Sequence, residues 1–366
     1  MKKGKYQVRI TPKRLVVDHI RSLIVSGRIG PGMRLPTRTE LERLFKTSPV
    51  TVQRAFDQLT EEGFVISEGR RGTFVAKNPP HLERYAIVFP YRNRPERPWS
   101  HFWTALSAEA GGFRLRNGHD LISFFGNETH LDLESYRVLE TDVLSHRLAG
   151  IIFVSKPFYL KGSAVLGAEG IPKVALMPHT DPELGGVKAV AMEPRLIEAA
   201  VRALVGSGRR RIGVITVPQM WEEVTRELGM LGVEVPLHWV QAASPEAPGA
   251  AGNMVKLLMG GGEGNRPDGL FVSDDNLVPS VTDAIAELGL KVPGEVMVVA
   301  HANFPHPTRS AVEAMRLGYD VRQVIEVCVG ILDRMRRGEP VPEVTYVPVV
   351  SGLEKRAEVR DETLPA

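Results

Sequence analysis

Three stretches near the N-terminus carry the local signals that begin an α-helix. Thr11-Pro12 pairs a capping side chain with a residue suited to the first helical position, and Ser48-Pro49 repeats this pair. Between them, Thr37 stands three residues before Glu40, which is the spacing of a reciprocal capping box. The predicted helices span residues 12–26, begin at residue 37, and span residues 48–62.

Two short strands joined by a basic turn follow the third predicted helix. Residues 64–68 and 73–76 are rich in β-branched and aromatic side chains, and Gly69-Arg70-Arg71-Gly72 connects them. Three short helices followed by such a hairpin predict a winged helix-turn-helix domain of the α+β class over residues 1–77. The hairpin is the wing, and its tip is basic.

The two parts of the chain carry opposite net charges. Residues 1–77 contain 16 Lys and Arg against 7 Asp and Glu, whereas residues 78–366 contain 30 against 36. A basic segment attached to an acidic one indicates that only the first meets a polyanion. Together with the helix pattern, this charge predicts double-stranded operator DNA as a partner.

The third helix offers polar side chains at its start, where a helix can enter the major groove. Gln53 is expected to pair with an adenine edge and Arg54 with phosphate or guanine, while the arginines at helix starts and at the wing tip hold backbone phosphates or the minor groove. The predicted DNA-binding residues are Arg34, Thr37, Arg38, Ser48, Thr51, Gln53, Arg54, Arg70, Arg71 and Gly72.

This region resembles the GntR family of bacterial transcription regulators. The resemblance covers about residues 13–77 and rests on Gly30-Pro31-Gly32, Arg34-Leu35-Pro36, Glu40-Leu41, Ser48, Thr51-Val52, Ala55, Leu59, Gly63 and Arg71-Gly72-Thr73-Phe74-Val75. Pro49 and Val50 stand where the family usually has Arg and Thr, and Gln53 stands where it commonly has a basic residue. We therefore expect an operator that differs from those of typical members.

Length and composition limit the architectures that the rest of the chain can adopt. A chain of 366 residues is long enough for two to three domains, and it has no apolar run near the roughly 18 residues of a membrane span. The basic N-terminus, Met1–Lys5, is followed by polar residues, so we expect no secretory signal. Cys328 is the single cysteine and cannot form an internal disulfide, which favours a location in the cytoplasm. Its apolar neighbours predict that it is a small buried hydrophobic residue.

Strand-length apolar runs alternate with helical stretches after residue 83. This alternation predicts parallel sheets covered by helices, and its recurrence after a long helix at 194–206 predicts two α/β lobes with a cleft between them. The predicted strands are 85–89, 120–125, 150–154, 173–177, 211–217, 238–241, 269–272, 296–300 and 343–350. The predicted boundaries are a linker at 78–82, the two-lobed domain at 83–350 and a C-terminal tail at 351–366.

This second region resembles the effector-binding domain of LacI-type repressors, which is periplasmic-binding-protein-like. The resemblance rests on residues 150–152, 204, 208–214, 267–275, 288–293 and 298–300. It implies that Asp275 is the acidic residue of the cleft, surrounded by loop residues suited to sugar hydroxyls and ring faces. The predicted effector-binding residues are Tyr91, Arg92, Asn93, Phe102, Trp103, Ser155, Lys156, His179, Gln219, Trp221, Asp274, Asp275, His301 and Asn303.

The second region also departs from the family's pattern. Ala191 stands where the family usually has Asp, and His301-Ala302-Asn303 replaces its Gly-aromatic-Asp. The Arg-containing stretch that normally follows the strand at 211–217 is missing. Either the effector is not a typical sugar, or the pocket uses Arg92 or Arg94 from the other lobe.

The sequence predicts a homodimeric transcription regulator, a repressor that binds a near-palindromic operator and responds to a small-molecule effector, possibly a sugar. No cofactor and no metal are expected, since His179, His301 and His306 lack metal-ligand spacing. Three alternatives remain: a pocket that has decayed and serves dimerisation or protein contact, a DNA-binding enzyme fusion, and a transport-type binding protein.

Overall fold

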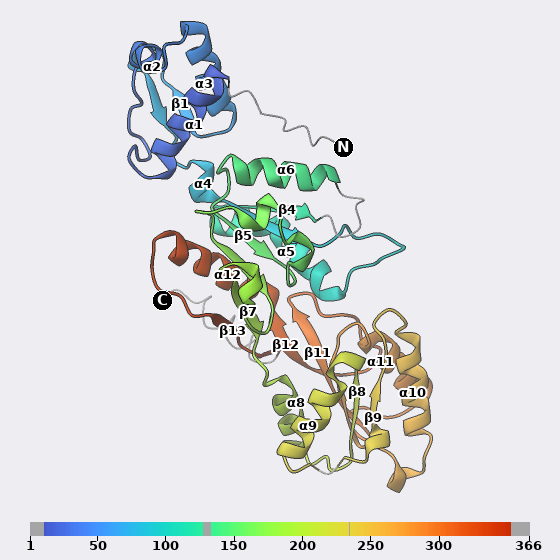
Figure 1. Cartoon of the computed structure of the whole chain (residues 1–366). Coiled ribbons are helices and arrows are strands. Elements are labelled where there is room, and N and C mark those ends of the chain that lie inside the picture. Colours follow the sequence, from blue (N-terminus) through green and yellow to red (C-terminus); the bar gives the residue numbers. More distant parts are fainter. Residues whose placement is uncertain (1–10, 127–132, 234, 353–366) are drawn as a thin grey trace, which may run out of the picture.

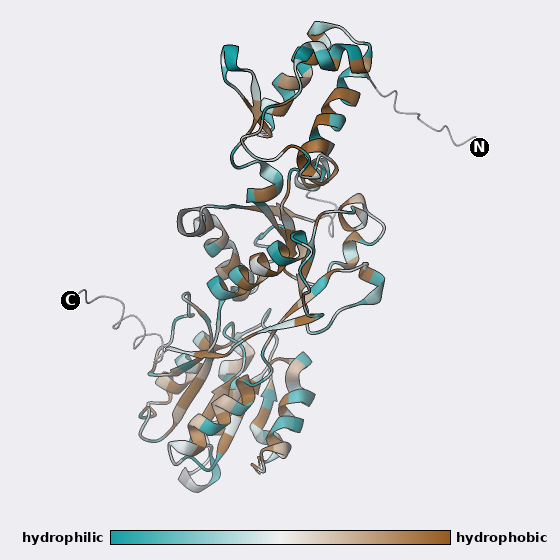
Figure 2. Ribbon diagram, turned by 90° about the vertical axis from the view of Figure 1, so that its left-hand side faces the viewer, coloured by the Kyte–Doolittle hydropathy of each residue, from teal (hydrophilic) through white to brown (hydrophobic). Residues whose placement is uncertain are grey.

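The computed structural model describes residues 11–126, 133–233 and 235–352. It contains a small N-terminal domain and two α/β lobes, which follow one another along the long axis of the molecule (Figure 1). The strands of both lobes are mainly hydrophobic, whereas the outer faces of the covering helices are hydrophilic (Figure 2). The expected fold class, a winged helix-turn-helix joined to a two-lobed α/β domain, is confirmed.

The N-terminal domain is built from the predicted local signals. Thr37 and Glu40 form the capping box, and the Ser48 side chain accepts a hydrogen bond from the backbone N–H of Thr51. The helices pack on a core that includes Leu41, Leu59 and Phe64. The elements are α1 (Pro12–Val25), α2 (Arg38–Phe45), α3 (Pro49–Glu61), β1 (Val65–Ser67) and β2 (Thr73–Val75).

The segment before α2 lies along the wing as an additional extended stretch. The backbone N–H of Leu35 donates to the carbonyl of Thr73, and the N–H of Val75 donates to the carbonyl of Met33, both at 2.9 Å. This pairing places the guanidinium of Arg34 beside Gly72, which has a φ of +114°. Arg34 therefore belongs to the wing as much as to the start of α2.

The first lobe is a parallel sheet with strand order β13-β7-β6-β5-β3-β4. Its described helices include one, α12, from near the C-terminal end of the chain, and α12 supplies much of the core that also contains Tyr85 and Phe89. The strands are β3 (Arg84–Phe89), β4 (Asp120–Phe125), β5 (Gly150–Phe153), β6 (Lys173–Leu176), β7 (Lys188–Met192) and β13 (Val344–Val347). The helices are α5 (His101–Asn117), α6 (Leu133–Leu144), α7 (Ala164–Gly167) and α12 (Val321–Arg336).

The second lobe has strand order β14-β12-β11-β10-β8-β9, parallel except for the β12–β14 pair. The strands are β8 (Ile212–Thr216), β9 (Val240–Ala242), β10 (Gly269–Val272), β11 (Met297–Phe304), β12 (Met315–Asp320) and β14 (Val350–Ser351). The helices are α8 (Leu196–Gly206), α9 (Trp221–Met230), α10 (Gly249–Met259) and α11 (Val278–Glu287).

The described chain passes between the lobes at three places, which are β7 to α8, β12 to α12, and β13 to β14. The sequence reading missed β7 and β12, and it treated residues 343–350 as one strand. That expectation was wrong, because Val344–Val347 pairs with β7 in the first sheet and Val350–Ser351 pairs with β12 in the second. Gly318 lies inside β12, and because glycine is uncommon in strands, the sequence around it does not predict a strand.

The expected linker at 78–82 overlaps a short helix. Residues 80–83 form a short helix, α4 (Pro80–Glu83), and Pro80 and His81 are buried. The His81 ring stacks on Phe64 with centroids 5.9 Å apart, and Arg336 at the end of α12 donates to the carbonyl of Leu82 at 2.9 Å. In the sequence, Pro79 and Pro80 indicate a break between two domains. In the structure they begin a helix that packs against both domains.

Burial makes the His81 contact sensitive to acid. Burial, assisted by the charge of Arg336, lowers the pKa of His81 from 6.5 to about 4, so the unfolded chain binds a proton more readily than the folded one. Stability from this site is complete above pH 6.5 and is lost as the pH falls toward 4, by about 1.4 kcal/mol per unit. Urea unfolding at pH 7.5 and 5.5 should show this loss, and His81→Phe should reduce the difference. An unchanged pH dependence in His81→Phe would contradict the assignment.

Candidate functional sites

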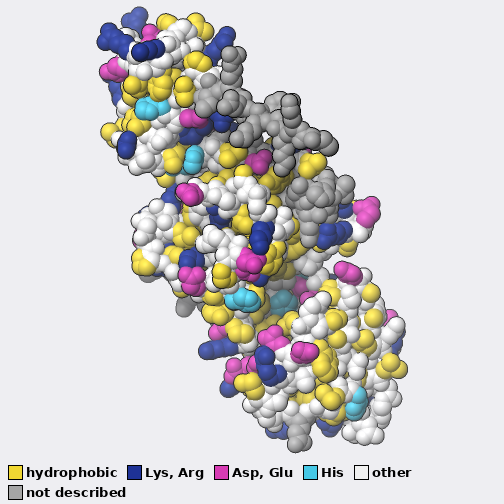
Figure 3. Space-filling model, viewed as in Figure 1, with side chains coloured by type: hydrophobic (Ala, Val, Ile, Leu, Met, Phe, Trp, Pro, Cys, Tyr) yellow, Lys and Arg dark blue, Asp and Glu magenta, His cyan; other side chains and the backbone are white. Residues whose placement is uncertain are grey.

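The predicted DNA-binding residues lie on exposed parts of the N-terminal domain. Arg34, Arg38, Arg70 and Arg71 are exposed, and Lys and Arg side chains gather over the end of the domain that is remote from the lobes (Figure 3). Arg71 pairs with Glu68 of the wing at 2.9 Å, and both side chains remain accessible. The wing and the start of α2 thus offer basic groups to one polyanion.

Several other predicted contacts have local roles. Thr37 and Ser48 are helix caps, and the Ser48 and Thr51 hydroxyl oxygens lie 3.0 Å apart. Gly72 lies against the Arg34 guanidinium, which a side chain at position 72 would contact. Arg54 lines a groove together with Lys13 and with Arg147 of the first lobe. Arg54 therefore lies at the boundary between the N-terminal domain and the first lobe.

A cleft of about 670 Å³ separates the two lobes. It lies at the carboxyl ends of β5, β6 and β7 of the first lobe and of β10 of the second, where parallel sheets place their ligands. The predicted residues that line it are Phe102, Trp103, Ser155, Lys156, His179, Asp274, Asp275, His301 and Asn303.

The sequence reading missed much of the cleft wall. Ala191, noted only as a departure from the family pattern, lines the cleft through β7. The remaining missed residues are largely apolar and come from strand ends and from the hinge between β7 and α8. They are Ser100, Val154, Leu176, Met177, Pro178, Val190, Met192, Glu193, Pro194, Leu196, Ile197, Met220, Glu223, Ser273, Asn276 and Tyr319.

Tyr91, Arg92 and Asn93 do not line the cleft, contrary to expectation. The loop after β3 folds on itself: Asn93 Oδ1 accepts from the backbone N–H of Trp99, and Trp99 Nε1 donates to the Tyr91 carbonyl, each at 2.9 Å. The Arg92 guanidinium lies 3.9 Å from the Phe125 ring centroid. Aromatic packing at the ends of β3 and β4 therefore holds these side chains outside the cleft.

Gln219 and Trp221 are also absent from the cleft wall. Trp221 packs into the second lobe, where its Nε1 donates to the Val240 carbonyl at 3.3 Å. Met220 and Glu223 line the cleft instead. Residues three apart share one face of a helix, so the start of α9 presents 220 and 223 rather than 221. If the first residue of α9 had been placed correctly from the sequence, Met220 and Glu223 would have been predicted to line the cleft.

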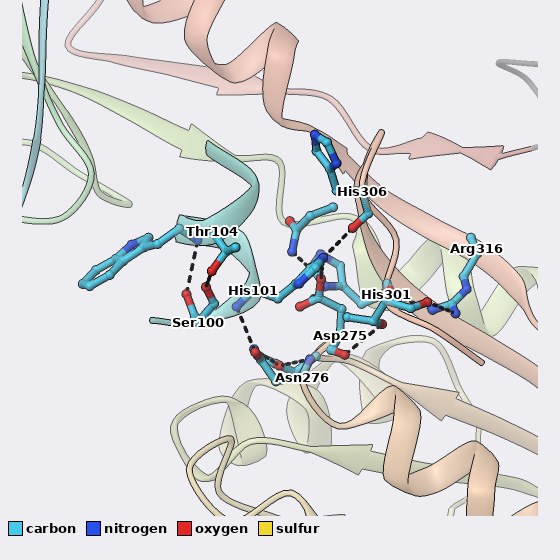
Figure 4. A network of polar contacts seen from close by, with 12 residues as sticks. Ser100, His101, Thr104, Asp275, Asn276, His301, His306 and Arg316 are labelled. Carbon is cyan, nitrogen blue, oxygen red and sulfur yellow. Dashed lines mark hydrogen bonds and ion pairs between the residues drawn. The ribbon is translucent and has the colours of Figure 1, made fainter. Parts of the chain in front are cut away.

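Asp275 is the centre of a polar network in the second lobe (Figure 4). The carboxylate is 2% exposed and accepts from Asn303 Nδ2 at 2.6 Å. His301 Nδ1 and His101 Nε2 each lie 3.9 Å from one of its oxygens. Burial raises the pKa of Asp275, and the two histidines oppose this shift; burial also lowers the pKa of His301.

Side chains of the first lobe join this network across the cleft (Figure 4). The backbone N–H of His101, at the start of α5, donates to Asn276 Oδ1 at 2.9 Å, and His306 Nε2 lies 2.8 Å from Oε1 of Glu109. Arg322 holds the other oxygen of the buried Glu109. The sequence gives no local signal for these contacts, because the partners are 175 and 197 residues apart.

Two buried polar atoms at the cleft lack a hydrogen-bond partner among the described residues. They are Oδ1 of Asn303 and Nδ1 of His301. Because buried polar groups are nearly always satisfied, these two atoms are exceptions in the wall of the cleft. Lys156 also lines the cleft, but Asp181 already holds its ammonium group at 2.7 Å.

Two family models match the chain. The model of bacterial regulatory proteins of the gntR family matches residues 12–75, and the model of the periplasmic binding protein-like domain matches residues 201–357. Both matches agree with the resemblances expected from the sequence. None of the described helices is long and apolar enough to span a bilayer.

Curated relatives include one that matches along nearly the whole chain. It is an arabinose metabolism transcriptional repressor from Halalkalibacterium halodurans, 23% identical over 391 residues, covering 96% of this chain and 98% of the relative. A second relative is the mannosyl-D-glycerate transport/metabolism system repressor MngR of Escherichia coli. It is 40% identical over 75 residues, which cover 20% of this chain and 31% of that protein.

Solved structures share the fold of the two lobes. A complex of the transcriptional regulator CelR with cellobiose has a TM-score of 0.54 at 17% identity, covering 84% of this chain and 90% of that one. A LacI family regulator from Arthrobacter sp. FB24 in complex with lactose has a TM-score of 0.55 at 16% identity, covering 74% and 97%. At these identities the likeness shows the fold.

Proposed function

We propose, from the premise that this chain joins a gntR-family DNA-binding domain to a periplasmic-binding-protein-like domain, that it is a ligand-responsive transcription repressor. One observation carries the proposal: a basic winged helix and a ligand-sized cleft between two lobes occur in one chain. The described residues of the cleft offer polar side chains and apolar surface that can bind a ligand. We therefore place the chain among regulators rather than enzymes.

The structure suggests how occupancy of the cleft reaches the DNA-binding domain. Helix α12 begins at Val321, where the chain crosses between the lobes, and ends where Arg336 donates to the α4 carbonyls. Near its start, Arg322 holds the Glu109 carboxylate that also meets His306 of the second lobe. A change in the angle between the lobes would therefore move α12 and shift α4. Coupling requires that the ligand bind the two lobe arrangements with different affinity.

We infer that the effector is an uncharged polyhydroxyl compound, such as a sugar. The cleft carries Glu193, Glu223 and Asp274 in addition to Asp275, and no arginine is among the described residues that line it. Sugar acids and sugar phosphates would meet net negative charge there. Trp103 offers an aromatic face for sugar C–H groups. One relative is named for arabinose metabolism, and two of the solved structures with the same fold hold cellobiose and lactose.

Two copies of the chain would bind one operator. Winged-helix readers engage a half-site each, and a two-fold axis between protomers matches a near-palindromic sequence. We expect the protein to elute as a dimer and to protect two half-sites against cleavage.

A melting-temperature screen of the full-length protein tests the effector assignment. L-arabinose, glucose, lactose and cellobiose would be compared with gluconate and glucose 6-phosphate at equal concentration. A ligand at a hundredfold its Kd adds about 2.7 kcal/mol of stability, so at least one neutral sugar should raise the Tm while the anions do not. The same sugar should change binding to a DNA selected from random sequence. Stabilisation by the anions alone would contradict the effector class, and failure to select any DNA would contradict the repressor assignment.

A further inference from the structure

Helix α3 carries a side-chain hydrogen bond at its exposed surface. Nε2 of Gln53 donates to Oδ1 of Asp57 at 2.6 Å, one helical turn further along. Asp57 is exposed and Gln53 is half-buried, and neither belongs to the core formed by Val52, Ala55 and Leu59. Asp57 also lines the groove that Arg54 shares with Arg147 of the first lobe, so its carboxylate faces the domain boundary. Gln53 lies one turn nearer the start of α3, the helix that the proposed function places in the major groove.

The chemistry of the carboxylate fixes the orientation of the glutamine. An ionised Asp57 can only accept hydrogen bonds, so the nitrogen of the Gln53 amide, not its oxygen, must face it. The remaining edge of the amide then presents one acceptor, Oε1, beside one free N–H. Turning the amide to present its nitrogen alone would break the bond to Asp57.

That edge matches one base and opposes another. Adenine presents an N7 acceptor beside an N6 amino donor in the major groove, whereas guanine presents two acceptors, N7 and O6. The fixed amide of Gln53 can donate to adenine N7 and accept from N6. Against guanine, Oε1 would face O6, and the nearby charge of Asp57 would add to the repulsion.

We propose that Asp57 is a specificity-determining positioning residue: by holding the Gln53 amide, it makes the recognition helix select adenine and reject guanine at one operator position. This proposal rests on the proposed function as a DNA-binding regulator. Asp57 acts through Gln53 and need not touch the base itself.

Selection of binding sites from randomised DNA by the full-length protein tests this proposal. In the wild type, the position whose preference disappears in Gln53→Ala identifies the base read by Gln53. At that position Asp57→Ala should lower the adenine-to-guanine ratio about tenfold, since a good bidentate contact discriminates by about 1–3 kcal/mol. Asp57→Asn, whose Oδ1 can still accept from Gln53, should retain most of the preference.

Two comparisons separate positioning from charge and from folding. Glu61→Ala removes the same charge from α3 two turns from Gln53, so it should strengthen binding to all DNA as Asp57→Ala does and leave the base ratio unchanged. In the Gln53→Ala background, Asp57→Ala should have no further effect on the ratio. Equal melting temperatures would establish that the variants are folded.

The outcomes distinguish the proposal from the function on which it rests. If the wild type selects no sequence, the repressor assignment fails. If it selects a sequence but Gln53→Ala alters no position, or Asp57→Ala leaves the adenine-to-guanine ratio intact, the role of Asp57 is refuted.

Discussion

Replacing Gly318 with alanine is expected to unfold the second lobe and to abolish any response to ligand. Gly318 is buried in β12, directly opposite Ala302 of β11, and a Cβ there would lie 1.9 Å from the Ala302 carbonyl oxygen. Backbone cannot move away without separating the strands that carry Asn303 and Tyr319 into the cleft. We expect a loss above about 4 kcal/mol, a range reached only by such disruptive changes.

Gly330→Ala is the matched control for this variant. Gly330 is exposed on α12, and nothing lies within 4 Å of an added Cβ. Alanine there should stabilise the protein by about 0.5–1 kcal/mol, because glycine is the weaker helix former. Urea unfolding followed by circular dichroism measures both variants. A Gly318→Ala protein as stable as the wild type would show that β11 and β12 can separate without loss of the fold.

The double replacement of Arg34 and Arg71 with alanine should weaken binding to every DNA sequence about a hundredfold near 0.1 M salt. Both guanidinium groups are exposed at the wing, and each phosphate contact contributes about 0.9 to the slope of log affinity against log salt. Losing two contacts should therefore reduce that slope by nearly two. Fluorescence anisotropy titrations from about 50 to 200 mM salt measure the slope and the affinity together.

Arg202→Ala is the charge-matched control, because Arg202 is 73% exposed in the second lobe and pairs with Glu198 of the same helix. It should leave the affinity and the slope unchanged. A loss confined to the selected operator, with random DNA bound normally, would show that these arginines read bases rather than phosphates.

The DNA-binding domain was predictable from sequence almost residue by residue. Its helices begin at caps formed by neighbouring residues, such as Thr37 with Glu40, so the signal for each helix start is local in the sequence. The extended segment around Arg34 was not foreseen, because its hydrogen bonds join residues about forty positions apart in the chain.

The cleft was predictable only where a residue directly follows a strand that the pattern reveals. Ser155 was found because β5 is a continuous apolar run, whereas Asp275 was found through the resemblance to LacI-type repressors. Met192 and Tyr319 were missed because β7 and β12 were missed. Tyr91 was misplaced because a position directly after a strand does not determine where a loop folds. Here the loop is held by aromatic contacts, the stacked pair of Phe89 and Trp99 and the T-shaped pair of Tyr91 and Trp103.

The packing of α4 limits how regulators of this design can exchange their parts. A chimera joined after Lys77 would bring a foreign N-terminal domain against His81, which needs an aromatic partner such as Phe64, while Arg336 would still hold the carbonyl of Leu82. A foreign N-terminal domain without an aromatic ring at position 64 would leave α4 packed against the first lobe only. Successful recombination has to transfer a compatible surface together with the fold.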